Sequence, residues 1–537
     1  FAYWTALLNV NETLLHGGKD FAGNQLYLPK VLKSWEFNPA GEYTDFTVKK
    51  GNYFHQGFGE VTADDVIYSA NEADPRCASA ETQALANPVR HSGLPDGDYG
   101  CWEKIDKWTV RQPWTGGHPG VRGMFEITDD AYPWGVYSKR AFEEKGWEWV
   151  RDNVIGSGPY EWEVLDKDTQ FSMIARLDSE NEDEKIPYIL RWRMRLVPEI
   201  ATLLALFEAG QGAISNDATG DELTRLLRLP DIKPIPNGGK LDAQWHWMGN
   251  YWETVHPITG EPLTRTHRTE NPWICAPGPD PLKPEVSDCN DVAKLFRKAL
   301  FTAIPRQMLL DTFYGGLGKT FMSPLSNSDD YIIKKYGDRW GDPYDPAKAK
   351  ALFEEWKVAY TAAGKNPDDV VITAWGSAGS HRAEVSEGQL SHWADLFGIK
   401  WEIDTTGQSA WAPAAWGGRE GWELVLDSAP TYRGIQMRWD SEAWWTARSA
   451  PLGTNHGTEL LMNSQTIAAK NENWDNPVEL ERLTVLNRDY YYEQGIQTTA
   501  LESKHNAIYN SNIIASWPIR GWWMIWDPQY VTLVDHR

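Results

Sequence analysis

The chain has 537 residues, of which 41% are hydrophobic and 24% are charged, a composition typical of globular proteins. This length exceeds what one hydrophobic core serves, so we expect two or three domains. The formal net charge of −23 at pH 7 would repel phosphate backbones, which argues against nucleic acid as a partner. We interpret this acidity as a feature that favours solubility.

Residues 34–73 predict strand, turn, strand, turn and helix, in that order. Apolar residues alternate over part of 43–48, which is typical of a half-buried strand. Thr62 then predicts a helix start, with Asp65 three residues later in the position of a capping-box acid. None of these residues indicates catalysis.

Hydrophobic periodicity predicts further elements along the chain. They are a helical stretch at 141–150, strands within 160–176, a strand at 188–197, a helix at 199–210, a helix from 290, a helix at 344–356, a strand at 370–377, a helix at 388–398, and strands at 399–404 and 422–427. Pro305 should end or kink the helix that starts at 290, or begin a following one. Strands followed by helices are typical of α/β domains.

The four cysteines form two local clusters, Cys77 with Cys101 and Cys275 with Cys289. Three pairings are possible, and pairing of neighbours closes the shortest loops. We predict these two disulfides, each adding roughly 3 kcal/mol to stability. Four free buried thiols are the alternative. Two disulfides would favour an oxidising compartment.

Several motifs that suggest chemistry do not support it. Residues 315–320 end like a phosphate-binding loop, but Phe313 stands where the first glycine is required, so we expect a turn. The sequence holds neither H-E-x-x-H nor G-x-S-x-G, and we predict no catalytic residue, no metal and no cofactor. We interpret the glycosylation sequon Asn11-Glu12-Thr13 as incidental.

The order of Phe54-His55-Gln56-Gly57 before Thr62-Ala63-Asp64-Asp65-Val66 resembles the FHDG…TAEDV pattern of the peptide/nickel class (family 5) of extracellular solute-binding proteins. Residues 156–160 resemble the GTGPY junction of that family, and the helices from 291 and at 344–356 resemble two of its helices. Pro305 departs from the family, which usually has Asp there. The resembling segments span most of residues 30–430.

The resemblance implies an α/β, bilobed periplasmic-binding-protein-like fold of class II, with an extra small satellite domain and a hinge between the lobes. It assigns residues 1–47, 156–290 and 426–537 to a discontinuous large lobe, 48–155 to the satellite domain and 291–425 to the second lobe. It also implies a periplasmic or extracellular protein. The family usually has one more strand before the equivalent of residues 1–10, so we expect a missing N-terminal segment that could carry a membrane anchor.

The function that the resemblance implies is the substrate-binding component of an ABC transporter, a monomer that closes over a medium-sized solute and passes it to a membrane permease. A peptide-like molecule is the favoured solute, and an oligosaccharide is the second choice. One alternative is a secreted carbohydrate-active hydrolase with a Trp-lined cleft, suggested by the 30 tryptophans. Another is a receptor that signals to a sensor protein.

Tryptophan offers a large rigid face and one hydrogen-bond donor, which suits stacking on sugar rings or peptide planes. Most of the 30 tryptophans should serve core packing. The resemblance places ligand contacts at Trp245, Trp247, Trp375, Trp411 and Trp416.

Three polar residues complete the predicted site. Arg419 could bind a carboxylate or phosphate through two parallel hydrogen bonds. Asp427 and Tyr432 flank the turn after strand 422–427, where peptide-binding members carry a carboxylate for the ammonium group of the ligand. A gapless overlay puts Tyr432 near that position, and Asp427 either substitutes for the carboxylate or acts as a structural cap.

Overall fold

The computed structural model describes residues 9–19, 25–73, 77, 101–114, 135–166, 170–177, 187–195, 197, 200–215, 220–234, 240–247, 272–273, 291–320, 331–341, 343–375, 381–404, 424–429, 473, 476–495, 497–503, 508–517 and 530–535. The chain divides into two compact units. Unit 1 comprises Phe1–Ala86, Gly97–Asn237 and His505–Arg537, and unit 2 comprises Asn87–Asp96 and Gly238–Lys504. The division into a large lobe, a satellite domain and a second lobe stays a prediction.

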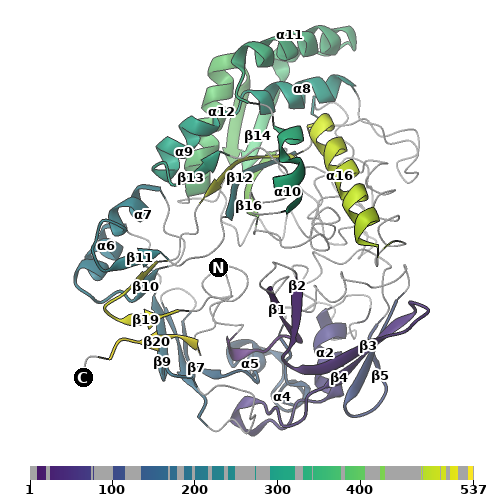
Figure 1. The fold of residues 1–537 in the computed structure, drawn as a ribbon, viewed down its shortest axis with the longest axis vertical. Coiled ribbons are helices and arrows are strands. Elements are labelled where there is room, and N and C mark those ends of the chain that lie inside the picture. Colours follow the sequence, from purple (N-terminus) through teal and green to yellow (C-terminus); the bar gives the residue numbers. More distant parts are fainter. Residues whose placement is uncertain are drawn as a thin grey trace. The chain divides into compact units, whose positions relative to one another are not determined.

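A four-stranded antiparallel sheet and three helices form one part of unit 1 (Figure 1). The strand order is β3 (Leu32–Phe37), β4 (Tyr43–Val48), β6 (Thr109–Pro113) and β5 (Glu103–Lys104). The helices are α2 (Ala63–Ala73), α4 (Lys139–Lys145) and α5 (Trp147–Asp152). Apolar side chains from both the sheet and the helices share one buried core. β4 alternates between half-buried and buried positions along its length, as predicted.

The predicted start of α2 is confirmed in a modified form. The Thr62 backbone N–H donates to Oδ2 of Asp65 at 2.9 Å, which is the backward half of a capping box. The Thr62 hydroxyl also donates to this oxygen, at 3.0 Å. Oδ1 of Asp65 accepts from the Lys139 backbone N–H at 3.0 Å. One buried carboxylate therefore joins the starts of α2 and α4.

The second part of unit 1 holds the antiparallel sheet β7 (Tyr160–Asp166), β8 (Gln170–Ala175) and β9 (Arg191–Arg195). Its core includes residues near the C-terminus of the chain, among them Trp517 and Val531. The remaining elements of unit 1 are β1 (Leu15–Lys19), β2 (Gln25–Pro29), η1 (His55–Gly57), α6 (Ile200–Glu208), β10 (Ile214–Ser215), α7 (Gly220–Leu226), β11 (Ile232–Pro234), β18 (Ile508–Asn510), β19 (Ile514–Ser516) and β20 (Thr532–Leu533).

Unit 2 is built on a six-stranded mixed sheet. Its order is β13 (Gly318–Thr320), β17 (Gln497–Ser503), β12 (Lys240–Trp247), β16 (Leu424–Ala429), β14 (Val371–Trp375) and β15 (Lys400–Asp404). β14 runs parallel to both β15 and β16, whereas β12 is antiparallel to both β16 and β17. The sheet thus joins strands that lie far apart in the sequence.

Helices pack on this sheet and on one another (Figure 1). They are α8 (Asp291–Thr302), α9 (Arg306–Tyr314), α10 (Tyr331–Tyr336), η5 (Gly337–Trp340), α11 (Pro346–Ala362), η6 (Pro367–Asp369), α12 (His381–Phe397) and α16 (Pro477–Gln494). α11 packs on α8, and α12 contacts β14, β15 and β16. The prediction for Pro305 is confirmed, because α8 ends at Thr302 and Pro305 immediately precedes α9.

Tryptophans fill much of the core of unit 2. Trp245, Trp273, Trp356 and Trp393 are at most 2% exposed and belong to one apolar cluster. The Trp356 ring lies 4.8 Å from the rings of both Phe296 and Phe353. The expectation that most tryptophans serve packing is therefore confirmed for these four.

The disulfide between Cys77 and Cys101 is confirmed, with the two Cα atoms 5.5 Å apart. Cys275 and Cys289 lie outside the described residues, so their pairing stays a prediction.

Two local predictions differ from the structure. The stretch 141–150 forms two helices rather than one, because Gly146 between them adopts φ 79°, which no α-helix contains. Residues 318–320, expected within a turn, form strand β13, which pairs with β17. A short strand at a sheet edge has too few residues to show a periodic pattern.

Candidate functional site

The ends of parallel strands define the candidate site in unit 2. Trp375, the last residue of β14, pairs with Val425 of β16 and with Asp404, the last residue of β15. Val425 also pairs with His246 of the antiparallel strand β12. Ligands of open α/β sheets bind outside the carboxyl ends of the strands. We call this row of paired residues the strand-end row.

Four of the predicted contacts come together around the strand-end row. Trp375 lies in the row itself, and the other three lie within two residues of it along β12 or β16. Their backbone pairs are Trp245 with Leu426, Trp247 with Leu424, and Asp427 with Gln244. The sequence analysis did not single out Asp404, whose position in the row depends on pairing between separate strands. Ligand contact by these residues stays a prediction.

Trp245 has a well-defined packing role. Its side chain is fully buried, and its ring lies 5.5 Å from that of Trp393 on α12. Trp393 in turn donates from Nε1 to the Leu300 carbonyl of α8 at 3.0 Å. Strand β12 is thereby fixed to two helices at the position where it passes the strand-end row.

The other predicted contacts, Trp411, Trp416, Arg419 and Tyr432, lie outside the described residues. They belong to the stretches before and after β16 and are therefore close in sequence to Val425 of the strand-end row.

A buried polar cluster in unit 1 joins the two motifs that carry the family resemblance. Nε2 of His55 donates to the Gly158 carbonyl at 2.8 Å, and the His55 backbone N–H donates to the Gly156 carbonyl at 2.9 Å. These partners are about 100 residues apart in sequence. This close fit requires glycine at both positions, since a Cβ on Gly156 or Gly158 would overlap backbone atoms of Asn9 or Val10.

Glu12 completes this cluster, and sequence reasoning missed it. Glu12 is 6% exposed, and its carboxylate accepts hydrogen bonds from Nδ2 of Asn52 at 2.7 Å and from the Ser157 hydroxyl at 3.1 Å. Buried carboxylates are stable only with such donors. These donors are 40 and 145 residues away in sequence, so no local pattern could have indicated them. The cluster fixes the N-terminal segment to the 156–158 junction.

No group of three potential metal ligands occurs among the described side chains. In the same part of the chain, every helix is too short or too polar to span a bilayer.

Solved structures with a similar fold are bilobed periplasmic binding proteins. The AgaA protein of A. tumefaciens R10, in complex with agropinic acid, matches with a TM-score of 0.73 at 14% identity, over 100% of this chain and 95% of that chain. DppA of Helicobacter pylori, in complex with the peptide STSA, matches with a TM-score of 0.68 at 16% identity, over 99% and 93%. AppA of Bacillus subtilis, in complex with a nonapeptide, matches with a TM-score of 0.67 at 16% identity, over 98% and 93%.

These similarities define the fold class, which is mixed α/β and bilobed. The family model of the bacterial extracellular solute-binding proteins, family 5, matches residues 27–429, and the chain belongs to this family. Comparison with curated proteins gives no significant match. The predicted family, fold class and general function as the binding component of an ABC importer are therefore confirmed.

Proposed function

We propose that this protein binds a peptide-like solute at the strand-end row and delivers it chemically unchanged to an ABC permease. The family match over residues 27–429 carries the proposal. Further support comes from Trp247, Trp375 and Asp427, three predicted contact residues that lie in the strand-end row or within two residues of it. The predicted monomeric state, the export and the membrane anchor belong to the same proposal.

Aromatic and charged residues give this edge a suitable composition for peptides. Indoles stack on peptide planes, and a carboxylate such as Asp427 suits the ammonium group of a peptide. The same indoles would also stack on sugar rings, so an oligosaccharide is the competing solute.

Thermal unfolding of the purified protein with panels of peptides and oligosaccharides tests the class of solute. A peptide present at 100 times its Kd should stabilise the protein by about 2.7 kcal/mol. Mass spectrometry of the incubated mixture should recover the peptide intact. If only oligosaccharides stabilise the protein, the solute is a sugar and the proposed peptide is wrong. Hydrolysis of any panel member would refute a purely binding function.

Replacement of Trp416 by Ala tests the predicted site. We expect the binding free energy of the identified solute to weaken by about 1–3 kcal/mol if this indole stacks on it. Trp147→Ala is the matched control, since Trp147 is an exposed residue of α5 in unit 1. Equal affinities for the two variants in titration calorimetry would exclude Trp416 from the site.

A further inference from the structure

Helix α12 carries two polar side chains in its buried face. Ser386 and Gln389 are both 0% exposed. In the described structure, neither the Ser386 hydroxyl nor either amide atom of Gln389 has a hydrogen-bond partner. Buried polar atoms of native proteins nearly always have a partner, either protein or ordered water. Three unpartnered atoms on one helix therefore indicate a missing partner.

The helical repeat places these side chains next to each other. Residues three and four apart in a helix are neighbours on its surface, so Gln389 lies between Ser386 and Trp393. Val385, Leu390 and Trp393 of the same helix belong to the apolar core of unit 2. The polar pair is thus surrounded by apolar side chains.

A third polar group comes from the sheet. The Trp245 ring packs on Trp393, one helical turn from Gln389, and its Nε1–H is buried without a partner among the described residues. The indole nitrogen is a donor only, the amide has two donors and an acceptor, and the hydroxyl is both donor and acceptor. Together they offer the two to four partners that an internal water molecule uses.

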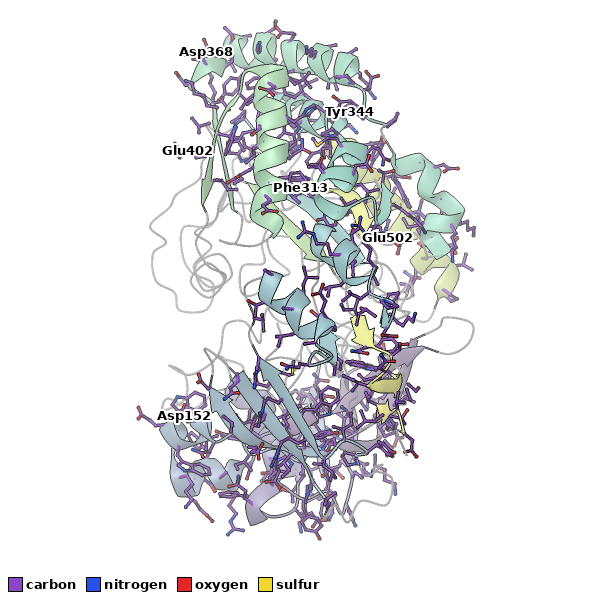
Figure 2. All side chains as sticks on the ribbon, turned by 90° about the vertical axis from the view of Figure 1, so that its left-hand side faces the viewer. Asp152, Phe313, Tyr344, Asp368, Glu402 and Glu502 are labelled. Atoms are coloured by element: carbon purple, nitrogen blue, oxygen red, sulfur yellow. A yellow bond between two sulfur atoms is a disulfide. The ribbon has the colours of Figure 1, made fainter. Side chains whose placement is uncertain are left out.

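Space beside this part of α12 is limited. A Cβ at Gly388 would lie 2.7 Å from the ring of Phe313 on α9. Phe313 is labelled in Figure 2. This contact limits the space on the side of the helix that faces α9.

We propose that Ser386, Gln389 and the indole N–H of Trp245 bind ordered water inside unit 2, between α12 and β12. The water accepts from the indole and from the amide NH2 and donates to the amide oxygen and the Ser386 hydroxyl. This site is independent of the proposed solute. It gives Trp245 a second structural role, since both its ring and its single polar atom then hold β12 against α12.

High-resolution crystal structures of the protein, with and without a stabilising solute from the panel, test the proposal directly. We expect electron density for water within hydrogen-bond distance of Gln389 and Ser386 in both. Absence of density, density only with solute, or a protein group in that place would overturn the proposal.

Two buried variants and one control give an independent test. Gln389→Met keeps the volume but removes the polar atoms, and Ser386→Ala removes the hydroxyl. Both should lower Tm, whereas Ser391→Ala, at an exposed position of the same helix, should leave it unchanged. If the pocket is dry, Gln389→Met removes an unpartnered amide and should raise Tm. An unchanged or raised Tm for Gln389→Met would therefore contradict the proposal.

Discussion

Gly158→Ala tests how tightly the N-terminal segment is held by the 156–158 junction. A Cβ on Gly158 would lie 2.5 Å from the carbonyl oxygen of Asn9 and 2.9 Å from that of Val10. Both neighbours are backbone atoms and cannot rotate away. Gly158 also donates from its N–H to the Val10 carbonyl at 2.9 Å and accepts from His55 at 2.8 Å. The added methyl group must therefore displace the segment and distort two hydrogen bonds.

The expected loss has two parts. Overpacking of a well-packed site costs about 1–3 kcal/mol, and each weakened hydrogen bond adds about 0.5–1.5 kcal/mol. We expect the free energy of unfolding to fall by roughly 2–6 kcal/mol in urea denaturation followed by circular dichroism. Gly51→Ala is the control: its φ is +81° but its Cβ would meet nothing within 4 Å, so it loses only about 1–2 kcal/mol. A Gly158→Ala variant no less stable than the control would refute the reasoning.

Three further predictions concern the disulfide and two titrating groups. Replacing both Cys77 and Cys101, which are 24 residues apart, by Ser should cost about 3 kcal/mol of unfolding free energy, and adding reductant should then have no further effect through this bond. Burial raises the pKa of Asp65 above its ordinary value of 3.8, although hydrogen bonds from Thr62 and Lys139 oppose the rise. The contribution of Asp65 to stability is therefore greatest below pH 3.8 and decreases as pH rises through the raised pKa. Asp65→Asn should accordingly gain stability relative to the wild type as pH rises from 3.8 through the raised pKa, and a difference independent of pH in urea titrations would contradict this. Burial lowers the pKa of His392 below 6.5, against the opposing charge of Asp395. Stability should thus decrease as pH falls through the lowered pKa, less steeply in His392→Asn, and equal slopes of Tm against pH would contradict the prediction.

Local patterns predicted most of the helices within the described residues. The cap at Thr62 and the proline at 305 each act through residues within one helical turn, and both are observed where the sequence indicates them. Strands β14 and β15 were equally predictable, because short apolar runs between loops indicate buried strands.

Long-range partners could not be predicted in the same way. β17 lies between β13 and β12, which come from positions about 180 and 250 residues earlier in the chain. The Glu12 cluster could not be predicted either, because its hydrogen bonds join residues that are 40 and 145 positions apart. For Trp245, alternation along β12 is compatible with either a ligand or a core contact, and only the position of Trp393 shows the packing role.

The burial of Asn11 affects how the protein can be produced. Its side chain is 0% exposed, and its atoms lie against Gly135 and Gly156. Asn11-Glu12-Thr13 is nevertheless an acceptor for oligosaccharyltransferase in a eukaryotic secretory pathway, where the sugar is attached before folding is complete. A glycan at this asparagine would prevent the N-terminal segment from docking. Secretion from yeast or mammalian cells should accordingly yield misfolded glycoprotein, and a Thr13→Ala change would remove the acceptor while leaving Asn11 in place.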